Sequence, residues 1–287
     1  MKHIFPIITF LLFFSLNANS QEVGPKNGSL VIVGGGGADP ALIKRFISLA
    51  GGPDANIVII PTANGSDDTG PAVKARAFAR FQAQGAKNLT LLHTFDRKEA
   101  DSDEFVQHIH NATGVWFSGG RQWRLVDAYG GTKSEEAFNG VLERGGVIGG
   151  SSAGASIQGS YLVRGDTKTN TVMMGDHQEG FGYLKNVGID QHLLKRNRQF
   201  DMVEVIEAHP ELLGIGLDEK TGIVVTGDQF EVVGPSYVVI YDPKLIQKNK
   251  TFYFLSAGDR FNLRTREAFR SSTRRTEMSF PKAISGN

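Results

Sequence analysis

The sequence predicts an α/β protein with a mostly parallel sheet, helices on both faces, and antiparallel strands added near the C-terminus. Three observations support this class. Apolar runs alternate with stretches of helical spacing, several runs end in glycine-rich turns, and short β-rich runs follow from residue 214 onward. We expect a single domain over residues 30–287, because neither a repeat nor a Pro/Ser-rich linker divides this part of the chain.

The first half of the domain supplies the alternating elements. Apolar runs predict buried strands over residues 30–33, 56–60, 89–92, 115–117 and 147–148. Helical spacing predicts helices over residues 41–50, 72–84, 104–110, 122–129 and 134–143. Further along, β-rich runs separated by turns predict antiparallel strands over residues 223–225, 230–233, 237–241 and 251–255.

The N-terminal residues have the layout of a secretory signal peptide, which we expect to span residues 1–20. Lys2 and His3 begin it, residues 4–16 are almost wholly apolar, and small residues occupy 18–20. The apolar stretch is shorter than the ~20 residues that span a bilayer. A polar leader, residues 21–29, follows. These features predict an exported protein, secreted or periplasmic, with no integral membrane segment after cleavage.

Composition excludes several classes of function. The chain carries 31 Lys and Arg residues against 30 Asp and Glu, a formal charge of +1, and no concentrated basic tract. Such a chain offers no electrostatic basis for nucleic-acid binding. The absence of cysteine excludes disulfides, thiolate zinc sites, iron–sulfur clusters and a cysteine nucleophile.

Four glycines at 34–37 directly follow the first strand. A dinucleotide-binding fingerprint would need glycine at 39 or a small residue at 40, where Asp39 and Pro40 stand. The Gly-Lys-Ser/Thr ending of a phosphate-binding loop is also missing. We therefore interpret this run as a tight turn that lets a helix and the sheet approach closely.

A sharper motif surrounds Ser152, where Gly150, Ser152 and Gly154 form a Gly-x-Ser-x-Gly pattern between a predicted strand and a predicted helix. This arrangement is typical of a nucleophile elbow, in which small neighbours permit a strained turn that exposes the serine oxygen. The amide of Ala153 then points to where an oxyanion would form.

A second amide donor is expected from Gly119 or Gly120, which follow the preceding strand of the predicted parallel sheet. The carboxyl ends of such strands are where ligands bind. Gln122, just beyond, is a candidate for holding a polar group of the substrate.

A serine nucleophile needs a base. Among seven histidines, His192 stands out, because polar Asp190 and Gln191 precede it at a predicted strand-to-helix transition. Lys195, Arg196 and Arg198 follow within two turns. These cations can receive carboxylates, although a solvated helix face is the usual meaning of such a cluster.

Together these motifs resemble the cyanophycinase and aspartyl-dipeptidase family of serine peptidases. The similarity covers residues 30–243 and is closest to cyanophycinase in its last motif. The matching segments are FSGGRQ at 117–122, GSSAGA at 150–155, VRGD at 163–166 and IDQH at 189–192, with Arg196 and Arg198.

The resemblance implies a flavodoxin-like fold related to class I glutamine amidotransferases, a homodimer, a peptide substrate, and no cofactor or metal. Cyanophycinases cut a β-linked aspartyl-arginine polymer into dipeptides, whereas the dipeptidases release an N-terminal aspartate. Carried over, Ser152 is the nucleophile and His192 the base, and the amides of Gly120 and Ala153 stabilise the oxyanion. The substrate site is then lined by Gln122, Asp190, Gln191, Arg196 and Arg198.

Three positions depart from the cyanophycinase pattern. Lys168 stands where a glutamate is expected, and Arg121 stands where aspartate is usual. A further arginine expected after the histidine falls near Asp201. These departures leave the serine chemistry intact and bear on the substrate.

The third member of a triad is expected among the carboxylates between Ser152 and His192. Asp166 is the preferred candidate, because it follows a β-like run and a glycine. Asp176 and Glu179 lie in a glycine-flanked loop and remain alternatives, and Asp190 is expected to face substrate.

Two other readings share some of these features. An α/β-hydrolase esterase also has Gly-x-Ser-x-Gly, but only forty positions separate Ser152 from His192, with no acid-bearing strand region between them. A catalytically degenerate family member would bind acidic or β-aspartyl peptides without cleaving them, a reading that Lys168 favours.

Overall fold

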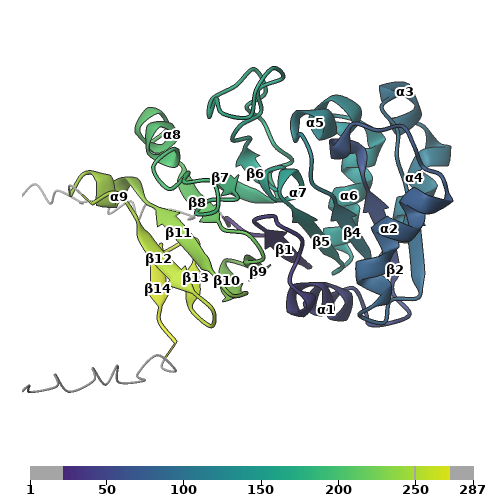
Figure 1. Cartoon of the computed structure of the whole chain (residues 1–287), viewed down its shortest axis with the longest axis horizontal. Helices are drawn as coiled ribbons and strands as arrows, with labels where there is room; N and C mark the ends of the chain where they lie inside the picture. Colours follow the sequence, from purple (N-terminus) through teal and green to yellow (C-terminus); the bar gives the residue numbers. More distant parts are fainter. Residues whose placement is uncertain (1–21, 249, 272–287) are drawn as a thin grey trace, which may run out of the picture.

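The computed structural model describes residues 22–248 and 250–271, which form two sheets with helices around them (Figure 1). The predicted signal peptide at 1–20 lies outside the described residues. The larger sheet has nine strands in the order β14-β13-β10-β9-β1-β5-β4-β2-β3, and the smaller has five in the order β12-β11-β8-β7-β6. Within the described part of the chain, no helix has the length and apolar character needed to cross a bilayer.

The parallel half of the larger sheet contains the five strands predicted from the apolar runs. They are β1 (Ser29–Val33), β2 (Asn56–Ile60), β3 (Asn88–Leu91), β4 (Gly114–Phe117) and β5 (Val147–Ser151). Each is parallel to its neighbours within this group. β5 runs three residues beyond the predicted end, because its last residues pair with β1 up to Val33. This extension brings the strand directly to Ser152.

Helices cover both faces of this half, as predicted. They are α1 (Pro40–Leu49), α2 (Pro71–Gln82), α3 (Arg97–Ala100), α4 (Asp103–His110), α5 (Trp123–Tyr129) and α6 (Lys133–Glu143). Successive strand residues point to opposite faces. Val31 accordingly packs in one cluster with Phe46 of α1, whereas Leu30 packs in another with Phe105 of α4 and Phe138 of α6. Only α3, a single turn, was not predicted.

Antiparallel strands extend both sheets, which confirms the prediction for the C-terminal region. β9 (Gly222–Thr226), β10 (Gln229–Val233), β13 (Arg260–Asn262) and β14 (Glu267–Phe269) continue the larger sheet from β1. β11 (Tyr237–Tyr241) and β12 (Tyr253–Ser256) join the smaller one. The sequence interpretation did not anticipate that these runs are divided between two sheets.

The smaller sheet also has a parallel part, which ends at the edge strand β6. The sequence interpretation gave no bounds for these strands, although it expected a strand before His192 and a β-like run before Asp166. This part consists of β6 (Gly159–Tyr161), β7 (Leu184–Gln191) and β8 (Leu213–Leu217). The two sheets share one apolar core, in which Ile32 of β1 belongs to the same cluster as Ile189 of β7 and Ile215 of β8. β1, β7 and β8 are therefore packed against one shared core.

Four short helices complete the described elements. They are η1 (Thr62–Asn64), α7 (Ala153–Ser156), α8 (Met202–Ala208) and α9 (Pro243–Ile246). The expected strand-to-helix transition at His192 is a strand-to-turn transition, because turns follow β7 and α8 begins only at Met202. Arg196 and Arg198 thus lie on a turn, not on a helix face.

Candidate active site

Ser152 occupies a strained turn between β5 and α7. Its backbone angles are φ 59° and ψ −112°, a conformation that non-glycine residues rarely adopt. Strain of this kind persists only where the surrounding structure enforces it, and here the chain reverses directly from a strand into a helix. The sharp turn predicted from the Gly-x-Ser-x-Gly pattern is therefore present.

Three side chains form a continuous hydrogen-bonded chain at this turn. Oγ of Ser152 lies 2.9 Å from Nε2 of His192, and Nδ1 of His192 lies 2.7 Å from Oε1 of Glu219. His192 directly follows β7, and Glu219 follows β8 after one intervening residue. A base bonded to a nucleophile and oriented by a carboxylate is the geometry of a serine-hydrolase triad.

The backbone of this triad is anchored to one segment at the end of β1. Successive carbonyls of Val33, Gly34 and Gly35 accept hydrogen bonds from the amides of Ser152 (2.9 Å), His192 (2.8 Å) and Lys220 (2.8 Å), the last adjacent to Glu219. Ser152 belongs to the larger sheet, whereas His192 and Glu219 follow strands of the smaller one. The segment therefore holds groups from both sheets in register.

The glycine run also makes room for the imidazole. A Cβ built on Gly35 would lie only 2.3 Å from Cε1 of His192, and Gly35 has a φ of +118°. The positive φ values at 35–37 agree with the predicted tight turn. The additional reason for glycine at position 35 is the ring packed directly against it, which the sequence interpretation missed.

Burial lowers the pKa of the His192 imidazole below its ordinary value, because the charged form loses hydration. The hydrogen bond and negative charge of Glu219 oppose this shift, whereas the positive charges of Arg196 and Arg198 add to it. The ring is therefore neutral at pH 7, the protonation state in which it can accept a proton from Ser152.

Backbone amides close to the serine are unengaged. Gly119 packs against Ser152, since a Cβ built on Gly119 would lie 3.3 Å from the Cβ of the serine. In residues 22–248 and 250–271, the amides of Gly119, Gly120 and Ala153 donate to no protein acceptor. Unpaired amides beside a nucleophile are the donors that an oxyanion requires.

The prediction that Asp166 orients the imidazole is wrong. Its Oδ1 accepts from the amides of Lys168 (3.0 Å) and Thr169 (2.7 Å), so the carboxylate stabilises its own loop. Of the alternatives, Asp176 accepts from Thr167, and Glu179 is exposed on the surface. The search between Ser152 and His192 missed Glu219 because the carboxylate comes from the next parallel strand along the chain. The apolar run at 213–217 followed by two acidic residues was the available signal.

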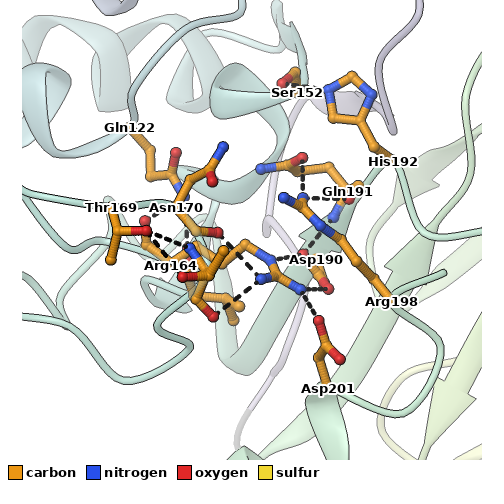
Figure 2. A network of polar contacts seen from close by, with 12 residues as sticks. Gln122, Ser152, Arg164, Thr169, Asn170, Asp190, Gln191, His192, Arg198 and Asp201 are labelled. Atoms are coloured by element: carbon orange, nitrogen blue, oxygen red, sulfur yellow. Dashed lines mark hydrogen bonds and ion pairs between the residues drawn. The ribbon is translucent and has the colours of Figure 1, made fainter. Parts of the chain in front are cut away.

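A buried ionic network lies below the triad, centred on Arg164 (Figure 2). The Arg164 side chain is 1% exposed and that of Asp190 is fully buried. Two bonds of 2.8 and 3.0 Å join them, and a third of 2.6 Å joins Arg164 to Asp201. Nη1 of Arg164 donates to the carbonyls of Asn170 (3.1 Å) and Thr171 (3.4 Å). All five guanidinium N–H groups therefore face acceptors.

This network corrects two predicted substrate contacts. The carboxylate of Asp190 is taken up by Arg164 and by the amide of Gln191 (2.8 Å), so it does not face substrate. Gln122 is 2% exposed, and its Nε2 donates to the carbonyls of Val163 (2.7 Å) and Arg164 (2.9 Å). Both side chains hold the protein together, because burying them without such partners would be costly.

The remaining predicted substrate residues lie beside His192. Oε1 of Gln191 and its carbonyl accept from Nη1 of Arg198 at 3.2 and 3.1 Å. Nε and Nη2 of Arg198 have no acceptor within the described residues. Arg196 is exposed on the turn. These two guanidinium groups are thus available to an anionic group.

The three departures from the family pattern have distinct places. Arg121 donates through Nη2 to the carbonyls of Asp166 and Thr169 and so ties down the loop after β6. Asp201 bonds Arg164, whereas Lys168 is exposed. None of these three contacts the Ser152–His192–Glu219 chain among the described contacts.

Known proteins match this chain over most of its length. The family model of peptidase family S51 matches residues 30–233. The chain is 31% identical to a protein named cyanophycinase from Geminocystis herdmanii over 262 residues, covering 83% of this chain and 95% of that protein. A cyanophycinase from a Nostoc species is also 31% identical, covering 86% and 91% of the two chains.

A solved structure is similar over nearly its whole length. The crystal structure of a peptidase from an acI-B1 actinobacterium superimposes with a TM-score of 0.66 at 26% identity, covering 84% of this chain and 98% of that one. The likeness confirms the predicted flavodoxin-like α/β class with antiparallel additions.

Proposed function

The chain belongs to peptidase family S51 as a cyanophycinase-like, serine-type peptidase, and on this basis we propose that Ser152, His192 and Glu219 are its catalytic triad. The observation that carries the proposal is the unbroken chain from Ser152 Oγ through His192 to Glu219, with contacts of 2.9 and 2.7 Å. Glu219 replaces Asp166 as the orienting acid.

In the acylation step, Oγ of Ser152 attacks the scissile carbonyl carbon while Nε2 of His192 takes the hydroxyl proton. The Nδ1–H of His192 donates to Glu219, whose negative charge stabilises the imidazolium. The imidazolium then gives its proton to the departing amine, and the C–N bond breaks to leave an ester on Ser152. Water, deprotonated by the same imidazole, hydrolyses that ester and restores the serine.

The amides of Ala153 and of Gly120, with Gly119 beside it, are the proposed oxyanion donors. Each is unpaired within the described residues and adjoins the turn that carries Ser152. Rigid donors aimed at the developing negative charge stabilise the transition state without reorganisation, and one such donor is worth about 10²–10³ in kcat.

The proposed substrate is a β-aspartyl, cyanophycin-like peptide cleaved to β-aspartyl dipeptides. Two supports are the cyanophycinase names of the relatives and the guanidinium groups of Arg196 and Arg198 next to His192. Cleavage to β-aspartyl dipeptides leaves the β-linkage intact, so the scissile amide is the other one at the aspartyl residue. The residue joined through the β-linkage keeps a free α-carboxylate, and a guanidinium fork suits such a group.

The site favours this activity over the esterase and the degenerate-binder alternatives. The triad runs Ser152, His192, Glu219 along the chain, whereas α/β-hydrolases have the acid before the histidine. Lys168, the departure that favoured a non-catalytic member, is exposed and has no described contact with the triad. Export through the N-terminal signal sequence and a homodimeric state remain part of the proposal.

The decisive experiment incubates the purified protein with cyanophycin and with a panel of isoaspartyl dipeptides, followed by mass spectrometry of the products. Ser152→Ala is the matched control. We expect β-aspartyl dipeptides from the wild-type protein, and an unchanged circular dichroism spectrum with no turnover from the variant. Near-normal hydrolysis by Ser152→Ala would refute the serine mechanism, and cleavage of neither substrate class would refute the assignment of substrate.

A further inference from the structure

The turn that carries Gly119 and Gly120 is built on the segment that follows β2. The amide of Ser118 donates to the carbonyl of Ile60 (2.9 Å), and the amide of Arg121 donates to that of Ala63 (2.7 Å). Between these bonds Gly120 has a φ of +147°, and a Cβ built on it would lie 1.9 Å from the Ala63 oxygen. Because there is no space for a side chain between Gly120 and Ala63, residues 60–63 set the position of the Gly120 backbone.

Thr62 lies in the middle of that supporting segment and is fully buried. Its Oγ1 is 2.8 Å from Nδ1 of His93 and 2.6 Å from the hydroxyl of Tyr129, which is also fully buried. The amide of Thr94 approaches the Tyr129 oxygen at 3.4 Å. The support is therefore fastened on its inner side by a polar chain that the proposed mechanism does not use.

The direction of these hydrogen bonds follows from the available protons. Burial raises the pKa of Tyr129 to about 12, so its hydroxyl stays protonated. The Thr94 amide is a donor to the Tyr129 oxygen, so the hydroxyl proton of Tyr129 can be accepted only by Oγ1 of Thr62. The hydroxyl of Thr62 in turn donates to Nδ1 of His93. Burial lowers the pKa of His93 and favours the neutral ring that can accept there.

The other end of this chain reaches the protein surface. Nε2 of His93 carries the remaining ring proton; it has no hydrogen-bond partner among the described residues and faces the exposed carboxylate of Asp67 at 3.7 Å. With this tautomer, each hydroxyl proton from Tyr129 to His93 has one acceptor. A hydrogen-bond chain with a single consistent direction holds its members in one arrangement.

We propose that Thr62, held by Tyr129 and His93, is a positioning residue that fixes the Gly120 amide at the oxyanion position. The inference rests on the proposed function and adds to it a residue that supports the oxyanion donor without contacting the substrate. Thr62 acts through the Ala63 carbonyl, which bonds Arg121 and packs on Gly120. Loosening this support moves a transition-state donor, so it lowers kcat and leaves ground-state binding unchanged.

Thr62→Val tests this role, because valine has nearly the shape of threonine and lacks the hydroxyl, and Thr62→Ser is the matched control that keeps it. Two readouts are needed: steady-state kinetics on a cyanophycin-like peptide, and the rate at which a fluorophosphonate probe labels Ser152. We expect Thr62→Val to lower kcat and the labelling rate about 10-fold, part of the 10²–10³ that a whole donor is worth. KM should stay within twofold, and Thr62→Ser should remain close to wild type.

Tyr129→Phe provides a second, milder perturbation, since it removes one hydroxyl and keeps the Thr62–His93 bond. It should lower kcat in the same direction by a smaller factor, and thermal melts of both variants separate this loss from unfolding. Labelling of Thr62→Val at the wild-type rate, or a raised KM with normal kcat, would overturn the inference while the triad stands. Failure of the probe to label the wild-type protein would overturn the proposed function and the inference with it.

Discussion

Nδ1 of His192 lies 2.7 Å from Oε1 of Glu219, although the two residues are 27 positions apart. They meet because β7 and β8 are parallel neighbours, with Gln191 paired to Leu217 at their carboxyl ends. Side chains that follow two such strands emerge at the same edge of the sheet. The pairing of β7 with β8 thereby makes a neighbour of a carboxylate that is distant in sequence.

The first prediction concerns this carboxylate. Glu219→Gln keeps the shape of the side chain but removes the charge that orients and stabilises the imidazolium, so kcat should fall by up to about 10⁴-fold, as in a serine-protease triad. Asp166→Asn is the control and should change kcat only slightly, because Asp166 bonds the amides of its own loop. Steady-state kinetics of both variants measure the two changes in kcat. An inactive Asp166→Asn variant together with an active Glu219→Gln variant would mean that Asp166, not Glu219, orients the imidazole.

The pH dependence of kcat/KM follows from the lowered pKa of His192. The base must be neutral, so activity should rise with pH through the His192 pKa, with the midpoint of the rise below the ordinary value of about 6.5. Glu219 raises this pKa, so a residual rate measured in Glu219→Gln should have its acidic limb at lower pH. An acidic limb centred above 6.5 in the wild-type protein would contradict the described environment.

The lowered pKa of His192 also makes the free energy of unfolding depend on pH. A folded-state pKa below the unfolded value means that the unfolded chain binds a proton more readily as pH falls through about 6.5. His192 therefore opposes folding progressively below that pH and has no such effect above it. Denaturant titrations of wild-type protein and His192→Gln across this range should show a difference that depends on pH.

The absence of a side chain at Gly35 leaves room for the imidazole of His192. Gly35→Ala should lower kcat by about 10²-fold or more, because a methyl group 2.3 Å from Cε1 displaces the ring from Ser152. Gly37→Ala is a matched control: Gly37 also has a positive φ, but a Cβ there meets nothing within 4 Å. Both variants should lose comparable stability from backbone strain, roughly 1–2 kcal/mol. Equal activity of the two variants would show that the ring does not depend on this contact.

Arg164 should matter for stability more than its distance from the triad suggests. Arg164→Met leaves the buried carboxylate of Asp190 without its ion pair, which costs about 3–5 kcal/mol in comparable cases. Adding Asp190→Asn should recover part of that loss. Asp201→Asn should cost less, since the Asp201 side chain is 38% exposed. Urea unfolding curves give the free energy of unfolding of the wild-type protein, the two single variants and the double variant. An Arg164→Met variant as stable as the wild type would mean that the network does not stabilise the fold.

The parallel half of the fold and the proposed nucleophile and base could be predicted because their signals are local. Each apolar run and each helical stretch between residues 30 and 151 reports its own structure. The turn at Ser152 is likewise predicted by the small residues next to it. His192 stood out through the polar residues next to it.

The rest of the site depends on pairings between distant segments, which one sequence does not reveal. Asp190 looked available to substrate because its partner, Arg164, lies 26 positions earlier and meets it only in the folded chain. Glu219 escaped notice because β7 and β8 were not predicted as parallel neighbours. The role of Gly35 likewise requires knowing that the imidazole lies on that glycine.

The anchoring of Ser152, His192 and Lys220 on successive carbonyls at the end of β1 also means that the triad is complete only when both sheets are in place. A chain in which only the larger sheet has formed holds a serine without its base, and the smaller sheet alone holds a histidine–glutamate pair without a nucleophile. A chain that lacks either sheet therefore lacks a complete triad. Recovery of hydrolysis during refolding should therefore report the formation of both sheets together, so that the enzyme's own activity measures how much of the chain has folded completely.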